Sequence, residues 1–164
     1  MTPSGDMPGW QAQQQSFSLA NMVPQTPELN RGIWAGIEIA VRDLAAREGE
    51  LYVVTGPAFQ GQRLQSIGAN GVLVPSATWK AVYSPQRGGA GVYVCANTSK
   101  PRCGVVPVAT LTTMVGVDPF PSLPASMKET AIALPTGEAG RHGSKKRGPR
   151  QRQPESLFEQ VFGR

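Results

Sequence analysis

The sequence is poor in the residues that build metal centres and membrane spans. It has a single histidine, His142, and two cysteines, Cys95 and Cys103. Because a structural zinc site takes four nitrogen or sulfur ligands, no zinc centre is expected. The longest uncharged runs, around Leu64–Trp79 and Gly104–Val117, are interrupted by Gly, Pro or Thr. Neither run is long enough for a transmembrane helix, so we expect no membrane partner.

Charged residues are also scarce, and they are unevenly distributed. They make up 16% of the 164 residues, against 40% apolar residues, 19 Gly and 15 Pro. This composition favours a loop-rich mixed fold over a helical bundle, in a chain long enough for one domain. Residues 1–135 carry 9 Lys or Arg against 8 Asp or Glu, whereas residues 136–164 carry 7 against 3. We therefore predict a near-neutral domain over residues 1–135 and a basic, disordered tail over residues 136–164.

The basic tail has two interpretations that its residues leave open. Lys145, Lys146 and Arg147, followed by Arg150 and Arg152, are able to bind nucleic acid through charge. Such binding would weaken steeply with salt. A solvated tail without a partner fits the same composition equally well.

The two cysteines leave a similar choice. Seven residues separate Cys95 from Cys103. A disulfide between them would close a small hairpin-like loop in an oxidising compartment. Two reduced and partly buried thiols are the other interpretation, and the sequence favours neither.

The apolar pattern predicts an α+β domain. Thr26 and Pro27 suit a helix start, and apolar residues at helical spacing continue to Glu48. We expect this Thr26–Glu48 helix to pack on a mainly antiparallel sheet, after an irregular lead-in over Met1–Ser18. The remaining predicted elements are strands at Leu51–Thr55, Gly71–Val74, Thr78–Tyr83 and Gly91–Cys95, a short helix at Ala109–Val115 and a helical turn at Ser126–Glu129.

Polar residues recur every four positions along the predicted helix. These residues are Asn30, Trp34, Glu38 and Arg42. At 3.6 residues per turn, such a row stays on one side of a helix. An amide oxygen, a carboxylate and a guanidinium are able to hold a hard metal ion, orient its water and neutralise a phosphate. The ordinary interpretation is a solvated helix face, with Trp34 as packing.

Residues near the predicted strands have ordinary structural interpretations, either as solvated surface or as core. Single basic residues beside strands are ordinarily solvated, and we interpret Lys80 and Arg63 in this way. A position along a phosphate track is the alternative for Lys80. Thr78, Trp79 and Tyr83 are interpreted as core rather than as a platform for stacking bases.

Several motifs, in order, resemble one nuclease family. They are the run Phe17–Gln25, the helix row with Leu29-Asn30, and the segments Tyr52–Pro57, Val74–Lys80 and Val117–Leu123. Together they are similar to the DNA/RNA non-specific endonucleases, which are ββα-metal nucleases of the His-Me finger type and include endonuclease G-like proteins. The resemblance covers roughly residues 1–135. It implies Mg²⁺-dependent, sequence-independent hydrolysis of phosphodiester bonds in DNA and RNA.

The resemblance also implies a role for each polar site residue. Asn30 would be the single protein ligand of one Mg²⁺ ion that is otherwise bound by water. Glu38 would hold a metal-bound water, and Arg42 would meet charge on the phosphate. Asn21 and Gln25 would frame the substrate site.

One part of the family pattern is missing from the sequence. The family's general base is a histidine in an Asp-Arg-Gly-His segment, and the sequence starts at the position that follows it. His142, in the predicted tail, is a poor replacement. We therefore expect an N-terminally truncated nuclease fold without substantial cleavage, or alternatively a non-catalytic remnant that binds nucleic acid through its tail. The family implies a secreted or periplasmic protein, although Met1–Gln15 does not resemble a signal peptide.

Overall fold

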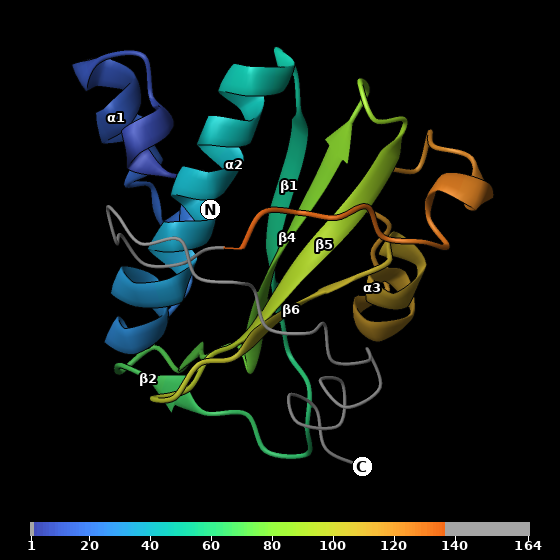
Figure 1. Cartoon of the computed structure of the whole chain (residues 1–164). Helices are drawn as coiled ribbons and strands as arrows, with labels where there is room; N and C mark the ends of the chain where they lie inside the picture. The colour runs from blue at the N-terminus through green and yellow to red at the C-terminus, as the bar shows by residue number, and fades with distance from the viewer. Residues whose placement is uncertain (1, 137–164) are drawn as a thin grey trace.

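An antiparallel sheet of four strands, in the order β1-β4-β5-β6, forms the centre of the fold (Figure 1). The structure is a computed structural model and describes residues 2–136. The four strands are β1 (Tyr52–Ala58), β4 (Ala77–Ser84), β5 (Gly89–Ala96) and β6 (Cys103–Val106). A separate two-stranded ribbon pairs β2 (Ser66–Ile67) with β3 (Val72–Leu73). The predicted α+β class and antiparallel sheet are confirmed.

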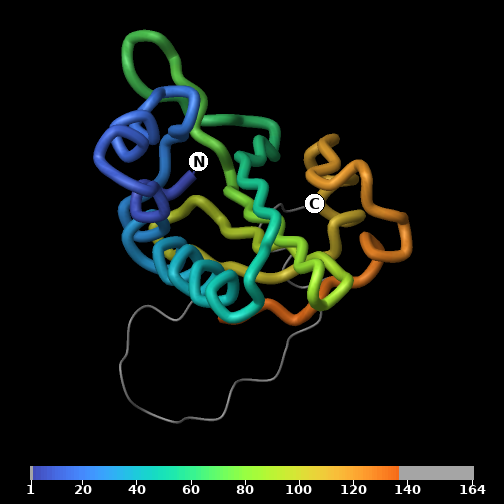
Figure 2. Tube along the Cα trace, turned by 90° about the horizontal axis from the view of Figure 1, so that it is seen from above, coloured from blue at the N-terminus to red at the C-terminus, as the bar shows by residue number. Residues whose placement is uncertain are grey.

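Helices cover both faces of the sheet. Helix α2 (Ala35–Glu48) lies on one face and α3 (Val108–Val115) on the other, as the view along the sheet shows (Figure 2). Trp79 and Ala81 of β4 belong to the core cluster that contains α3, whereas Val82 belongs to the cluster that contains α2. Side chains alternate between faces along a strand, so Lys80 shares the α2 face with Val82. The predicted core positions of Thr78 and Trp79 are confirmed, with exposed fractions of 0% and 4%.

The predicted single helix over Thr26–Glu48 is wrong in one respect. A π-helical segment, η3 (Leu29–Trp34), precedes α2, and Gly32 within it has non-helical angles of φ −98° and ψ −114°. Glycine reaches such a conformation more easily than other residues, so the helix is interrupted here. Thr26 does cap the start, because its hydroxyl accepts a hydrogen bond of 3.3 Å from the Leu29 amide.

The strands that are rich in β-branched residues were predicted well. Thr78–Tyr83 and Gly91–Cys95 lie within β4 and β5, and Leu51–Thr55 and Gly71–Val74 overlap β1 and β3. Ala109–Val115 lies within α3, and the turn at Ser126–Glu129 overlaps a 3-10 turn, η4 (Ala125–Met127). Strands β2 and β6 were not predicted. Both are short, and glycines lie in or beside them.

The irregular lead-in predicted for Met1–Ser18 is also wrong. This segment contains a 3-10 turn, η1 (Ser4–Asp6), and helix α1 (Trp10–Ser16), and a second 3-10 turn, η2 (Leu19–Asn21), follows. None of these elements buries a residue. An apolar face, which is the main sequence signal for a helix, is therefore missing.

A disulfide joins Cys95 to Cys103, which settles the choice that the sequence left open. The two cysteines face each other in the register of β5 and β6. The bond therefore ties the edge strand β6 to the centre of the sheet. The predicted basic tail, apart from Thr136, lies outside the described residues. Within residues 2–136, no helix has the length and apolar character needed to cross a membrane.

Candidate active site between α2 and the sheet

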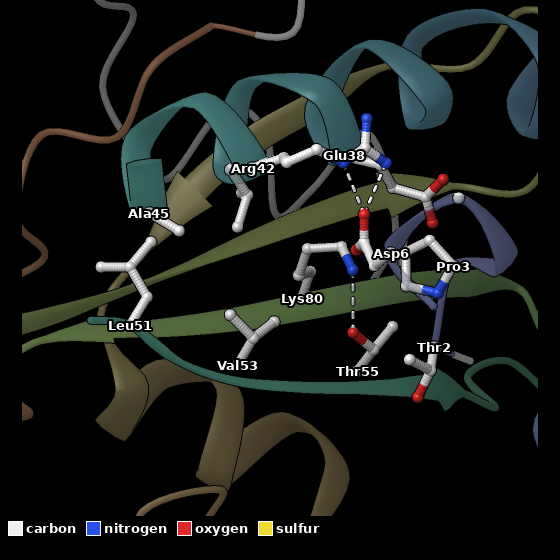
Figure 3. Close-up of a pocket in the computed structure, with 12 residues that line it drawn as sticks. Thr2, Pro3, Asp6, Glu38, Arg42, Ala45, Leu51, Val53, Thr55 and Lys80 are labelled. Atoms are coloured by element: carbon white, nitrogen blue, oxygen red, sulfur yellow. Dashed lines mark hydrogen bonds and ion pairs between the residues drawn. The ribbon is translucent and has the colours of Figure 1, made fainter. Parts of the chain in front are cut away.

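A pocket of about 510 Å³ opens between α2, β1 and the first residues of the sequence (Figure 3). Apolar side chains of α2 and β1, including Val41 and Val53, form one side of it. The polar side chains that line it are Thr2, Asp6, Glu38, Arg42, Thr55 and Lys80. Two acidic and two basic groups therefore face one concave space.

Glu38 and Arg42 come to this pocket from one face of α2. They are four residues apart, so their side chains lie on the same side of the helix. Glu38 is half-buried, and burial raises the pKa of its carboxyl, against the opposing effects of Lys80 and a hydrogen bond with Trp34. The Arg42 guanidinium forms an ion pair with Asp6, in which Nη2 lies 2.5 Å from Oδ1. The helix thus presents a carboxylate and a guanidinium to the same space, whereas Asn30 of the predicted row does not line it.

Lys80 enters the pocket from the sheet. Only 2% of its surface is exposed, so the interpretation of Lys80 as a solvated residue is wrong. Its Nζ donates a hydrogen bond of 3.0 Å to Oγ1 of Thr55, which is its register partner on β1. The same amine lies 5.3 Å from the centre of the Trp34 ring. Burial lowers the pKa of the Lys80 amine, while the charges of Glu38 and Asp6 act to raise it.

The alternation of β4 contained a signal for this position. Lys80 lies between Thr78 and Val82 on the strand face that the helix covers. A charged residue between two buried positions of one face is itself expected to be buried. Lysine is ordinarily a surface residue, so hydropathy alone does not predict that this position is buried.

Asn30 lies in η3, ahead of the break at Gly32, and does not line the pocket. It is exposed to solvent. Trp34, four residues later, is 2% exposed and belongs to the core cluster on the α2 face. The prediction that Trp34 serves packing is confirmed.

Asn21 and Gln25 lie outside the pocket lining, on the segment that leads into η3. The Asn21 side chain accepts a hydrogen bond of 2.6 Å from the Thr2 amide and donates one of 2.9 Å to the Thr2 carbonyl. It therefore fastens the first residues beside the pocket. Gln25 Nε2 lies 3.5 Å from Oγ1 of Thr78, at the limit of a hydrogen bond.

Asn97 is a positioning residue that the sequence did not reveal. It is 9% exposed, and its Nδ2 donates hydrogen bonds to the carbonyls of Pro24 and Pro75, at 3.0 and 2.9 Å. Its Oδ1 accepts one of 2.8 Å from the Thr26 amide. These bonds fix the start of η3 against the sheet. No local sequence pattern indicates that its side chain is buried.

The described residues contain no cluster of three or more His, Cys, Asp or Glu side chains suited to a metal ion. An ion held at Asn30, outside the pocket lining, would therefore take few protein ligands and several waters. Mg²⁺ tolerates this arrangement, because it gives up its water reluctantly. Asn30 is exposed and carries an amide oxygen, which belongs to the carbonyl type of ligand that suits Mg²⁺.

Comparisons with known proteins connect this arrangement to nucleases. The model of the DNA/RNA non-specific endonuclease family matches residues 1–126. A nuclease of Nostoc sp. is 39% identical over 85 residues, which are 51% of this chain and 30% of that protein. Mitochondrial endonuclease G of Homo sapiens is 33% identical over 87 residues, which are 48% of this chain and 29% of that protein. The chain thus spans less than a third of the length of these curated relatives.

A solved structure shares the fold. It is the crystal structure of an EndoG/EndoGI complex, which concerns the mechanism of EndoG inhibition. The match has a TM-score of 0.62 and 26% identity, and it covers 71% of this chain and 55% of that chain. The predicted ββα-metal nuclease fold is therefore confirmed.

Proposed function

The chain belongs to the DNA/RNA non-specific endonuclease family, and from this premise we propose that it carries the metal-binding and phosphate-binding side of a Mg²⁺-dependent endonuclease site. The substrates are DNA and RNA, cleaved without regard to sequence. One observation carries the proposal: Glu38 and Arg42 share one face of α2 and open into one pocket. A site that binds phosphates does not distinguish one base from another, because phosphates carry no sequence information.

In this proposal Asn30 is the protein ligand of the metal. Its exposed position supports this role, since the ion needs room for its waters. When bound, Mg²⁺ supplies charge stabilisation to the phosphate and to the leaving oxygen. Mn²⁺ is a paramagnetic substitute that broadens nearby NMR signals. It is expected to broaden the Asn30 side-chain amide signals before those of Asn97, which is buried against the sheet.

Glu38 and Arg42 act from the helix. Glu38 would orient a water molecule beside the ion by accepting a hydrogen bond from it. Arg42 offers two or more N–H groups to phosphate oxygens, which the planar guanidinium suits well. Asn21 and Gln25 support the substrate site from outside the pocket. Asn21 does so by holding Thr2 beside it, and Gln25 through its approach to Thr78.

The sequence lacks the family's Asp-Arg-Gly-His segment, and we infer that the 164 residues alone do not cleave substantially. A positioned general base contributes about 10²–10⁴ in rate. Nicking of supercoiled plasmid by the purified chain tests this inference. Nicking that requires Mg²⁺ and disappears in Asn30→Ala would contradict it.

A second candidate function is nucleic-acid binding through the basic tail. The excess of 7 basic over 3 acidic residues in 136–164 favours it. Deleting the tail separates the two functions. A binding module would lose its salt-dependent affinity for DNA on deletion, whereas the proposed nuclease site would keep its metal response at Asn30.

We also propose that the protein works in a secreted or periplasmic setting. The Cys95–Cys103 disulfide supports this, because disulfides persist in oxidising compartments. Mass spectrometry of unreduced peptides from the native cell is expected to recover the two cysteines linked. Recovery of two free thiols would contradict the proposal.

A further inference from the structure

Lys80 is a positively charged residue to which the proposed function assigns no role. It sits in the second strand of the sheet and lines the same pocket as Glu38 and Arg42. Figure 3 shows its amine directed towards the space below Asp6, with the bond to Thr55 on its other side. A lysine in such a place is unusual, because burying an ammonium without compensation is costly.

The hydrogen-bonding capacity of this amine is not used up by the protein. An ammonium group carries three N–H donors. One donates to Thr55 Oγ1, and the Trp34 ring faces the amine without accepting a conventional hydrogen bond. Among residues 2–136, the ion pairs within 4.0 Å are Arg42–Asp6, Arg87–Glu48 and Lys128–Asp118, so none involves Lys80. A donor therefore remains for a ligand in the pocket.

The charges around the pocket favour an anion as that ligand. Asp6 is already paired with Arg42. No ion pair within 4.0 Å joins Glu38 to the Lys80 amine. The Lys80 charge is thus only partly compensated by its neighbours. Burial lowers the pKa of the amine, which supports the same conclusion. An anionic oxygen in the pocket would complete its environment.

We propose that Lys80 binds a non-bridging phosphate oxygen, so that the phosphodiester lies between Lys80 of β4 and Arg42 of α2. This proposal rests on the proposed nuclease function and adds a second cationic contact to it. Thr55 is the positioning residue, because its hydroxyl fixes the Lys80 amine from the neighbouring strand. Trp34 places an aromatic face beside the same amine and limits its movement.

A purely structural role for Lys80 makes a different prediction. In that case the amine would serve only to tie β4 to β1 through Thr55. Removal of the charge would then change stability and leave anion binding unaltered. The two roles are therefore separable by measuring anion binding and folding on the same variants.

The experiment is a titration of the full 164-residue chain with inorganic phosphate, followed by NMR of the lysine Cε–Hε signals. In the unsubstituted protein the Lys80 signal is expected to shift and saturate, whereas chloride at matched ionic strength leaves it in place. In Lys80→Met the phosphate affinity is expected to fall roughly tenfold or more, as for a lost charged hydrogen bond. Lys100→Met is the matched control, because Lys100 is exposed and lies outside the pocket lining.

Equal phosphate affinity in Lys80→Met and the unsubstituted protein would overturn the proposal. If Lys80→Met does not fold, as judged by circular dichroism, the phosphate titration of the unsubstituted protein is the test. A Lys80 signal that phosphate does not move would then overturn it. The titration measures no cleavage, so its failure leaves the Asn30 test of the nuclease function untouched.

Discussion

Asp6 forms an ion pair with the guanidinium of Arg42. Both Nε and Nη2 of Arg42 lie against the same oxygen, Asp6 Oδ1, at 2.6 and 2.5 Å. The Asp6 side chain is 35% exposed and the Arg42 side chain 45%. An ion pair this open to solvent stabilises a fold by about 0–1 kcal/mol. Its larger effect is competition, because a phosphate that binds Arg42 must displace or share Asp6.

The competition can be measured in Asp6→Asn. The amide binds Arg42 more weakly than the carboxylate does, so phosphate affinity is expected to rise roughly two- to fivefold. The same phosphate titration gives this affinity. Asp43→Asn is the control, because it removes the same charge from an exposed position next to Arg42 that does not line the pocket. Equal gains in both variants would indicate net charge rather than competition.

The Glu38 carboxyl makes stability depend on pH in an unusual direction. Its pKa is raised by burial above the ordinary value of 4.5. Between 4.5 and the folded pKa, the folded chain keeps a proton that the unfolded chain has released. The free energy of unfolding therefore falls as pH rises through this window, and Glu38→Gln is expected to remove that fall. Urea unfolding at a series of pH values measures it.

Glu48 provides the contrast for that measurement. Its pKa is lowered, first by the hydrogen bond from Ser84 and then by Arg87. Its contribution to stability is therefore present above pH 4.5 and lost as pH falls through the folded pKa. Glu48→Gln should lower stability at neutral pH. A Glu38→Gln variant that behaves in the same way would contradict the burial of Glu38.

Gly56 allows the Trp79 ring to pack closely against β1. The two residues are register partners, and a Cβ added at Gly56 would collide with the ring. Gly56→Ala is expected to destabilise the fold by about 1–3 kcal/mol, the usual cost of overpacking. Chemical denaturation measures the loss. Ser66→Ala, on the exposed β2, should change stability by no more than about 0.5 kcal/mol.

The Cys95–Cys103 disulfide closes a loop with a sequence separation of 8. In the chain-entropy account a loop of this size stabilises the fold by about 2–3 kcal/mol. Replacing both cysteines by alanine is expected to remove roughly that amount. Reduction of the unsubstituted protein should match the double variant, and an unchanged midpoint of unfolding would count against the bond.

The sequence predicted the central strands and the polar face of α2 because local patterns determine both. Thr78–Tyr83 and Gly91–Cys95 are β-branched, apolar runs, and Glu38 and Arg42 follow helical spacing. The break at Gly32 was missed because the apolar pattern continues across it. Helix α1 was missed because it buries nothing.

The burial of Lys80 and the pairing of Asp6 were missed for a different reason. Lys80 is buried by Trp34 and Thr55, and Asp6 meets Arg42 across 36 positions of sequence. Such contacts depend on how distant elements pack, so the alternation of β4 indicates burial of Lys80 but does not identify its partners. The family resemblance supplied roles for the residues on α2, but gave none to Lys80 or Asp6.

The most direct test of the account restores the part of the family pattern that the sequence lacks. A family segment carrying the Asp-Arg-Gly-His motif and its preceding strands is joined ahead of Met1, and cleavage of plasmid DNA and of RNA is measured with and without Mg²⁺. We expect Mg²⁺-dependent cleavage of both, reduced by about a hundredfold or more in Asn30→Ala. Changing the added histidine to alanine should cost roughly 10²–10⁴ in rate. A folded fusion that stays inert, or one that cleaves equally well with Asn30→Ala, would contradict the proposed site.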